Sequence, residues 1–507
     1  MPAQNPTLGS HTAALQHNSR PAILQRDHQR LLIGGEWVAA ASGKHFDSFN
    51  PATGEVIARL AEGDASDVDR AVNAARVAFN GEWSQWKPYD RQRLLLRVHD
   101  LIDKNFDELA LLETLDMGAP LQRTLGLRRY ISQLIMFYAG QTMNVAGATL
   151  PNSLPGNITT LSLKAPVGVV GGIIPWNGPL ISQWWILGPV LATGCTAVMK
   201  PAEDASLSVL RIAELLLEAG MPAGVVNVVT GQGGVAGAAL AEHRDVDRIA
   251  FTGSTQTGRK IIQASASNIK RLQLELGGKS PDIVFADANL DMAVPGAAMA
   301  AFNNTGQICF AGTRLFVQRS IQEQFLERLA AFSRTLRVGN GVEAGVQLGP
   351  IISAKQLDNV MRYIDIGTKE GATLACGGRR LQGGDWGDGF FVEPTVFGNV
   401  RNEMTIAQEE IFGPVISVIP FDDAEDALRL ANDIDYGLGG AVWTRSLSTA
   451  MKVSQGIKAG TVWVNCYGQI DPGVGFGGYR MSGYGWKGGP QHVDAFLYQK
   501  AVYLNLD

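Results

Sequence analysis

Cys309 is the residue whose type and setting most clearly suggest chemistry. It lies in 303-NNTGQICFAGTR-314, among small and polar residues, and is one of four cysteines in 507 residues. A thiol in such a place is either a buried structural group or a nucleophile. None of the seven histidines is close to it in sequence, so the arrangement of Cys–His proteases fits poorly. If Cys309 is a nucleophile, other groups must activate it.

Two further segments supply groups that could act with a nucleophile. Glu275 begins 275-ELGGKSP-281 at the end of a predicted strand. It is either a partly desolvated general base or an exposed loop acid. Asn177 lies between two prolines in 175-PWNGP-179, where its amide either donates to an oxyanion or satisfies a tight turn. Around a nucleotide site, the three residues would supply nucleophile, base and oxyanion donor.

Three other segments suggest that nucleotide site. Ser254 in 253-GSTQTG-258 follows a predicted strand and could cap a helix whose free N–H groups suit a phosphate. The segment 231-GQGGVA-236 is an imperfect version of the glycine-rich dinucleotide fingerprint. In 200-KPAE-203, Lys200 and Glu203 could hold a pair of sugar hydroxyls, or form a charge pair at a helix start.

Composition excludes several classes of function. The net charge is -5 and no basic run appears, so we expect neither nucleic acid nor an acidic membrane surface as a partner. The longest apolar stretches carry charges and are too short to span a bilayer. The four cysteines are scattered, without a C-x-x-C pair or a histidine cluster. This spacing argues against a disulfide framework or a metal site and favours a reducing cytoplasm.

The elements that must position these residues alternate along the chain. Apolar strands are expected at 167–175, 196–200, 225–231, 248–253 and 272–276, with helices at 179–193, 206–220, 235–243 and 256–266 between them. Such alternation predicts a doubly wound parallel α/β sheet, with ligands at the carboxyl ends of its strands. A second alternating region contains strands at 282–287, 314–318 and 461–465 and a helix at 321–336. We expect residues 1–28 to be a disordered tail.

The chain resembles the NAD(P)-dependent aldehyde dehydrogenases of the non-acylating kind over about residues 31–507. The resemblance rests on an ordered set of motifs: PWNGP, KPAE, FTGSTQTG (251–258), LELGGKSP (274–281), GQICFAGTR (306–314), EEIFGPV (409–415) and FGGYRMSGYG (476–485). It implies a Rossmann-like NAD-binding domain at 29–147 and 169–279 and a catalytic α/β domain at 280–480. It also implies a small oligomerisation part at 148–168 and 481–507, made of an arm and the C-terminal strand.

The resemblance assigns roles residue by residue. Cys309 would attack the aldehyde carbon, Asn177 would hold the oxyanion, and Glu275 would activate the water that hydrolyses the thioester. Lys200, which we also count among the catalytic residues, would hold the adenosine ribose with Glu203. Because Glu203 would repel a 2′-phosphate, NAD is expected over NADP. The remaining expected cofactor contacts are Pro175, Trp176, Gly233, Phe251, Ser254, Gly277, Glu410 and Phe412.

Two positions depart from the family pattern together. Ile186 follows Trp184-Trp185 where many relatives carry lysine, and Lys487 stands where many carry an acid. In relatives that lysine and acid are thought to relay protons from the general base. Our hypothesis is that Lys487 takes over the cationic end of this relay for Glu275. The alternative is a solvated surface lysine, with water alone as the relay.

The residues expected along the substrate tunnel also differ from those of relatives that use small aldehydes. Gly178, Ser182, Asn303 and Ile470 stand where such relatives tend to carry Phe or Met, and Trp185, Phe310 and Phe476 remain as apolar walls. A wider tunnel favours medium or bulky aromatic or branched aliphatic aldehydes over acetaldehyde. A betaine-type or semialdehyde substrate is the alternative, since Trp and Tyr467 could offer cation–π faces.

Two other classes of function, and the expected partner and assembly, remain to be considered. A CoA-dependent acylating enzyme should lack the water-activating acid, so Glu275 argues against it. A catalytically silent binding relative should lack the nucleophile, so Cys309 argues against that alternative. The expected partner is a small-molecule aldehyde, and no metal is expected. We expect a homodimer or homotetramer in the cytoplasm.

Overall fold

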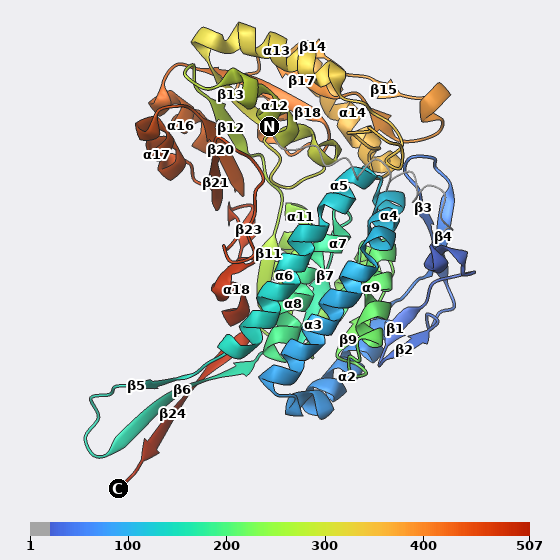
Figure 1. Cartoon of the computed structure of the whole chain (residues 1–507), viewed down its shortest axis with the longest axis vertical. Coiled ribbons are helices and arrows are strands. Elements are labelled where there is room, and N and C mark those ends of the chain that lie inside the picture. Colours follow the sequence, from blue (N-terminus) through green and yellow to red (C-terminus); the bar gives the residue numbers. More distant parts are fainter. Residues whose placement is uncertain (1–20) are drawn as a thin grey trace.

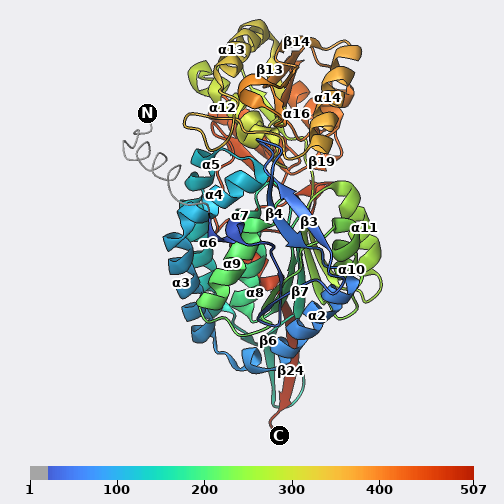
Figure 2. The ribbon, with the colours of Figure 1, turned by 90° about the vertical axis from the view of Figure 1, so that its right-hand side faces the viewer.

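The computed structural model describes residues 21–507, which form two α/β domains and a projecting arm (Figures 1 and 2). The first domain contains an eight-stranded sheet. Its strands, in spatial order, are β2 (Glu36–Val38), β1 (Leu31–Ile33), β9 (Val226–Val228), β8 (Thr196–Lys200), β7 (Val169–Ile173), β10 (Arg248–Thr252), β11 (Arg271–Glu275) and β23 (Gly483–Tyr484).

The five central strands, β9 to β11, are parallel, and the chain order reverses between β7 and β10. This is the doubly wound arrangement that the alternation of strands and helices predicted. The helices of this domain are α2 (Ala65–Asn80), α3 (Pro88–Lys104), α4 (Phe106–Met117), α5 (Leu121–Gly126), α6 (Arg128–Gln141), α7 (Pro179–Ser182), α8 (Trp184–Thr193), α9 (Leu207–Glu218), α10 (Ala238–Glu242), α11 (Thr255–Ser265) and α18 (Gly489–Asp494).

The two faces of the sheet are covered by different helices, because successive strand residues point to opposite sides. One core contains Val170 and Ala197 under α3, α4, α6, α8 and α9. The other contains Val169 and Val198 under α2, α10 and α11. Figure 2 shows these two helical layers on either side of the strands.

The second domain contains a seven-stranded sheet. Its strands, in spatial order, are β14 (Thr373–Cys376), β17 (Thr395–Gly398), β18 (Val415–Phe421), β13 (Arg314–Gln318), β12 (Pro281–Val284), β20 (Gly439–Trp443) and β21 (Thr461–Val464). All pairs except β14–β17 are parallel. Its helices are α12 (Leu290–Phe302), α13 (Gln322–Thr335), α14 (Ala354–Lys369), α15 (Thr405–Gln408), α16 (Ala424–Asn432) and α17 (Leu447–Gly456).

The arm is a three-stranded antiparallel sheet that projects away from both domains (Figure 1). Its central strand is β6 (Ile158–Pro166), flanked by β5 (Ala148–Leu150) and by β24 (Leu497–Asn505). Three short pairs complete the described strands: β3 (His45–Phe49) with β4 (Val56–Ala61), β15 (Arg380–Leu381) with β16 (Phe391–Val392), and β19 (Tyr436–Gly437) with β22 (Tyr479–Arg480).

Two predicted boundaries are wrong. The tail was expected to reach residue 28, but Ala22–Gln25 form a 3-10 turn whose Ile23 and Leu24 are buried in the first core. Residues 1–20 lie outside the described residues. The segment 481–507 was assigned to the arm, but β23 joins the first sheet and α18 packs against α8. Only β24 belongs to the arm, because a single long strand is all that β6 can pair on that edge.

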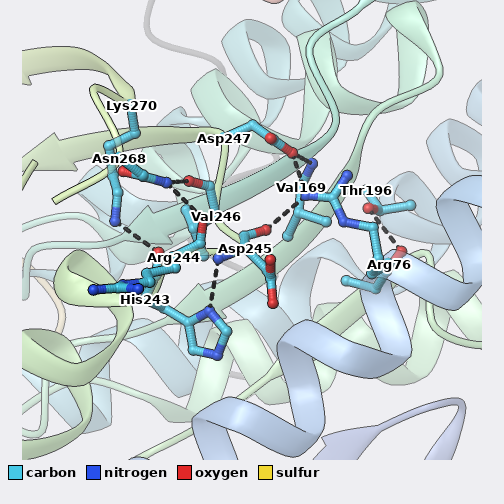
Figure 3. Close-up of polar contacts among 11 residues, drawn as sticks. Arg76, Val169, Thr196, His243, Arg244, Asp245, Val246, Asp247, Asn268 and Lys270 are labelled. Carbon is cyan, nitrogen blue, oxygen red and sulfur yellow. Dashed lines mark hydrogen bonds and ion pairs between the residues drawn. The ribbon is translucent and has the colours of Figure 1, made fainter.

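Polar contacts tie the amino ends of the strands together, at the edge of the first sheet opposite the predicted site (Figure 3). The Asp247 carboxylate accepts the Val169 N–H (2.7 Å) and an N–H of Arg76 (2.5 Å). Lys270 donates to the carbonyls of Ala241 (2.6 Å) and His243 (2.8 Å), at the end of α10. These contacts satisfy backbone groups that the helix and strand ends leave free. Among the described residues, no helix is long and apolar enough to cross a membrane.

Candidate active site

The candidate site lies at the point where the strand order of the first sheet reverses. In open parallel sheets this is where ligands bind, because the loops after neighbouring strands diverge there. Trp176 and Asn177 follow β7, Ser254 follows β10, and Gly277 follows β11. The loops that the sequence predicted to form a site therefore lie together at one edge of the first sheet.

A cavity of about 270 Å³ opens at this edge, between the two domains. The first domain contributes Pro175, Trp176, Asn177, Thr252, Gly253, Ser254, Glu275, Leu276 and Gly277, and the second contributes Cys309, Gln356, Asn359, Glu410, Ile411 and Phe412. The thiol, the carboxyl group and the amide predicted to act together thus line one cavity.

Cys309 is held at the cavity by an unusual stretch of backbone. Asn304 and Thr305 adopt left-handed φ values of 54° and 56°. Gly306 follows at φ 73°, where a Cβ atom would lie 2.1 Å from the Gly413 carbonyl oxygen, so only glycine fits. Burial raises the pKa of the Cys309 thiol to about 12, and the largest opposing influence is the charge of Lys487. The thiol therefore needs positive charge nearby to ionise.

Asn177 is fixed beside this stretch by reciprocal amide bonds. Its Nδ2 donates to the Gln307 carbonyl (2.9 Å), and Asn304 Nδ2 donates to the Asn177 carbonyl (3.1 Å). A carboxamide carries two N–H donors, so one bond orients the group and a second donor remains. This geometry suits a preorganised donor to an oxyanion.

Glu275 is a buried carboxyl group, so its interpretation as an exposed loop acid is wrong. Its side chain is 2% exposed, and neither oxygen has a hydrogen-bond partner within residues 21–507. Burial raises its pKa to about 8, while the charge of Lys487 lowers it. A carboxyl group that titrates near neutral pH and is not hydrogen-bonded can accept a proton from water.

Glu410 and Phe412 are held by the loop after β11 and by helix α14. The Gly278 N–H donates to Glu410 Oε1 (3.1 Å). A Cβ at Gly277 would lie 2.1 Å from Glu410 Oε2, so this position excludes any side chain. Gln356 Nε2 donates to the Phe412 carbonyl (3.0 Å), which steadies Phe412 at a left-handed φ of 56°.

Lys200 and Glu203 form a separate group beyond the end of β8. Lys200 Nζ lies 2.9 Å from Glu203 Oε2, and the Gly233 N–H lies 3.5 Å from Glu203 Oε1. Although burial raises the pKa of Glu203, the neighbouring ammonium holds it below its ordinary value, so the carboxylate is charged. Lys200 is not among the residues that line the Cys309 cavity, so the structure gives no geometry for a catalytic role.

The two remaining predicted cofactor residues lie on β10 and just after it. Ser254 caps helix α11, since its Oγ accepts the Thr257 N–H (3.2 Å), and it lines the cavity. Phe251 is buried within β10 and lies under Gly253, where a Cβ would come 2.4 Å from its ring. Phe251 therefore shapes the loop rather than lining the cavity.

The aromatic residues predicted to wall a tunnel do pack together near Cys309. Phe476 stacks on Trp185 (ring centroids 6.5 Å apart, planes 8° apart) and meets Phe310 edge-on at 5.6 Å. Ile470 and Cys309 contact the same apolar cluster. Of the smaller predicted residues, Gly178 precedes α7, Ser182 is the buried last residue of α7, and Asn303 is exposed after α12.

Lys487 is buried, so it is not the solvated surface lysine of the alternative hypothesis. It is 6% exposed, and its Nζ donates to Thr252 Oγ1 (2.8 Å) and lies 4.5 Å from the centre of the Trp185 ring. Thr252 and Gln356 were not predicted as site residues. A threonine ending a strand and a glutamine within a helix carry no chemical signal by type, and only the packing of the two domains reveals them.

Known proteins resemble this chain over nearly its whole length. The aldehyde dehydrogenase family model matches residues 37–502. The chain is 47% identical to aldehyde dehydrogenase family 2 member B4, mitochondrial, of Arabidopsis thaliana over 503 residues, covering 99% of this chain and 92% of that protein. It is 44% identical to the mitochondrial benzaldehyde dehydrogenase of Antirrhinum majus over 497 residues, covering 97% and 92%.

Solved structures show the same fold. An NAD+ complex of an aldehyde dehydrogenase from Bacillus cereus superposes with a TM-score of 0.94 at 44% identity, covering 97% of this chain and 99% of that one. A point mutant of betaine aldehyde dehydrogenase from Staphylococcus aureus, complexed with NAD+, gives 0.93 at 39% identity, covering 95% and 98%. With these matches along nearly its whole length, the chain belongs to the aldehyde dehydrogenase family.

Proposed function

We propose that this protein oxidises an aldehyde to the carboxylic acid with NAD as the electron acceptor. The observation that carries the proposal is the meeting of Cys309, Asn177 and Glu275 around one cavity beside the sheet's reversal point. The NAD+ complexes of two similar enzymes support the choice of cofactor.

The residues present fit this cofactor. Glu203 is charged and has an edge open to solvent, as a ribose diol requires, and it would repel the 2′-phosphate of NADP. Ser254 and the start of α11 suit the pyrophosphate. Glu410, positioned by Gly278, suits the nicotinamide ribose, and Phe412 and Trp176 form walls whose rings meet edge-on at 5.2 Å. When bound, NAD accepts the hydride from the substrate carbon.

The protein's own residues perform the other steps. The Cys309 thiol gives its proton to the ionised Glu275 carboxylate as Sγ forms a bond to the aldehyde carbon, and Glu275 then passes this proton on toward Lys487 and solvent. The developing oxyanion accepts hydrogen bonds from Asn177 Nδ2 and the Cys309 backbone N–H. Loss of hydride from this thiohemiacetal leaves a thioester on Cys309. Glu275 takes a proton from water, the resulting hydroxyl attacks the thioester carbon, and the Cys309 thiolate leaves as the acid forms.

Lys487 serves as the cationic end of the proton path from Glu275. It is buried, it influences the pKa of both Glu275 and Cys309, and Ile186 leaves no lysine on α8 to do so. A buried ammonium beside both groups favours their charged forms.

The substrate is a medium or bulky aldehyde, aromatic or branched aliphatic. The wall formed by Trp185, Phe310 and Phe476 supports this class, as does the similarity to a benzaldehyde dehydrogenase. A betaine-type or semialdehyde substrate is the second candidate, favoured by the similarity to betaine aldehyde dehydrogenase. A catalytically silent relative is the alternative of another class.

The assembly is a homodimer or homotetramer in the cytoplasm. Exposed apolar residues on the arm and its two open strand edges suit addition of another subunit. All four cysteines are free, which suits a reducing compartment.

The test is NADH formation at 340 nm across aldehydes from acetaldehyde to aromatic and branched ones, with NAD against NADP. We expect NAD-linked turnover that peaks on bulky aldehydes, is abolished in Cys309→Ala and does not respond to CoA. Steady decline from acetaldehyde to benzaldehyde would refute the substrate class. Turnover that survives in Cys309→Ala would refute the mechanism, and no turnover on any aldehyde would favour the silent relative.

A further inference from the structure

A buried cation lies against the aromatic wall of the predicted tunnel. Lys487 Nζ is 4.5 Å from the centre of the Trp185 ring and 2.8 Å from Thr252 Oγ1. Thr252 lines the same cavity as Cys309 and Glu275, and Trp185 stacks on Phe476. The ammonium group therefore contacts one residue of the cavity, Thr252, and one residue of the aromatic wall, Trp185.

The backbone holds Lys487 rigidly in this place. Its N–H donates to the Phe476 carbonyl and its carbonyl accepts the Phe476 N–H, both at 2.7 Å. The next residue, Gly488, has a φ of 71° and donates its N–H to His492 Nδ1 (3.1 Å). Tyr138 Oη lies 2.7 Å from the same nitrogen, so Nδ1 is the acceptor and the ring proton is on Nε2. Burial lowers the pKa of His492 well below its ordinary value, so this network stays neutral.

Trp185 is therefore already engaged by a cation of the protein itself. A quaternary ammonium group on a substrate would find the Trp185 ring already in a cation–π contact with Lys487. The positive charge of Lys487 would also repel it. The carboxyl groups nearby do not cancel that charge fully at neutral pH, because burial raises the pKa of Glu275 to about 8 and that of Glu410 to about 7. The Cys309 thiol is neutral in the resting state because burial raises its pKa, and His492 beside Lys487 is neutral as well. Burial lowers the pKa of Lys487, and Glu275 and Cys309 oppose this effect.

We propose that Lys487 sets the charge selectivity of the substrate tunnel, admitting neutral and anionic aldehydes and excluding those that carry a permanent cation. This inference rests on the proposed function and narrows its substrate class, since it disfavours the betaine-type alternative. It concerns specificity and is separable from the part that Lys487 plays in proton transfer.

The first experiment compares two substrates of the same shape. Betaine aldehyde and 3,3-dimethylbutanal differ only in a quaternary nitrogen against a quaternary carbon. We expect kcat/KM of the native enzyme to favour the neutral aldehyde at least 100-fold after correction for hydration. In Lys487→Met this ratio should fall at least tenfold. Lys487→Arg should keep it, and Lys104→Met, a change at an exposed lysine on α3, should leave it unaltered.

The second experiment needs no turnover. Methanethiosulfonates carrying a trimethylammonium, a neutral methyl or a sulfonate group would be reacted with the native enzyme, and modification of Cys309 followed by peptide mass spectrometry. We expect the cationic reagent to react at least tenfold more slowly than the anionic one, after division by their rates with a free thiol. Lys487→Met should remove most of this difference.

The outcomes separate the inference from the proposed function. Equal rates for the two aldehydes, or reagent rates that do not depend on charge, would overturn the charge selectivity. A Lys487→Met enzyme that is slower on both aldehydes with an unchanged ratio would also overturn it. If no aldehyde is oxidised, the proposed function fails, and the thiol reagents still decide whether Lys487 selects by charge.

Discussion

At the scale of one residue, Glu275 shows how burial raises the pKa of a carboxyl group that could act as a base. The carboxyl group ends β11, is almost fully enclosed, and makes no hydrogen bond within the described part of the chain. Water would stabilise its charged form, so enclosure favours the protonated form and moves the pKa toward neutrality. The one strong opposing influence is Lys487.

The pH dependence of thioester hydrolysis follows from this arrangement. Glu275 must be ionised to take a proton, and its pKa is raised to about 8, so the hydrolysis rate should rise with pH and level off above about 8. Lys487→Met removes a charge that lowers this pKa, so the rise should move to higher pH and hydrolysis at neutral pH should fall roughly tenfold.

Single-turnover measurements of acid release from about pH 6 to about pH 9.5 would test this prediction. Glu275→Gln should lose the pH-dependent rise, and Lys104→Met serves as the control lysine. A rate independent of pH in the native enzyme, or a profile unmoved in Lys487→Met, would show that Lys487 does not act on Glu275.

The residues of the site differ in how well their roles and burial could be predicted from the sequence. Each of Cys309, Glu275 and Asn177 had an ordinary alternative by itself, and the ordered set of motifs along the chain predicted their roles. The burial of Lys487 could not be predicted, because a lysine is usually exposed and its surroundings come from α8, β10 and β11. The same is true of the orientation of Glu410, which depends on Gly277 and Gly278 in the other domain.

At the scale of elements, the turn between α11 and β11 carries local strain. Asn268 donates to the Arg244 and Val246 carbonyls, and Lys270 is anchored at the end of α10 (Figure 3). The residue between them, Ile269, is forced to a φ of 58° while its side chain is 90% exposed. A β-branched residue in the left-handed region is strained, and nothing compensates for it here.

Ile269→Asn should therefore stabilise the protein by about 1 kcal/mol, because asparagine tolerates this backbone conformation better. The measurement is the midpoint of chemical denaturation of the first domain. Ile262→Asn is the matched control, since Ile262 is also exposed but lies within helix α11. A gain in the control as large as in Ile269→Asn would mean that loss of an exposed isoleucine, and not backbone strain, is responsible.

The strands were more predictable than their ends. The five parallel strands of the first sheet lie where apolar β-branched runs predicted them, because both faces of each strand are buried. The helix expected at 235–243 differs: it begins as a π-helical turn at Gly233–Gly237 before α10. Three glycines weaken the helical preference there, and the close approach to Lys200 and Glu203 decides the geometry.

At the scale of the whole molecule, the arm is the part through which we expect subunits to associate. Both edges of its sheet are open within the chain, and Leu150, Leu163, Tyr503 and Leu504 are exposed on its strands. Leu150→Glu combined with Leu504→Glu should place charge on both edge strands and shift the proposed dimer or tetramer to smaller species.

Sedimentation velocity at several concentrations would measure this shift. Leu447→Glu, at a leucine exposed on α17 far from the arm, should leave the assembly unchanged. A native protein that sediments as a monomer would refute the homo-oligomer, and an unchanged oligomer in the double variant would place the interface elsewhere.

The return of residues 483–507 to the first domain and the arm has a consequence for synthesis on the ribosome. Strand β23 closes the edge of β11, the charge of Lys487 acts on Glu275, and β24 completes the arm, and all three follow the other strands of both sheets in the sequence. While this segment remains inside the ribosome, β11 offers an unpaired edge to chaperones and Glu275 lacks its cation. The nascent chain can therefore build the rest of both sheets first, but the charge of Lys487 can act on Glu275 only after residue 487 has left the ribosome.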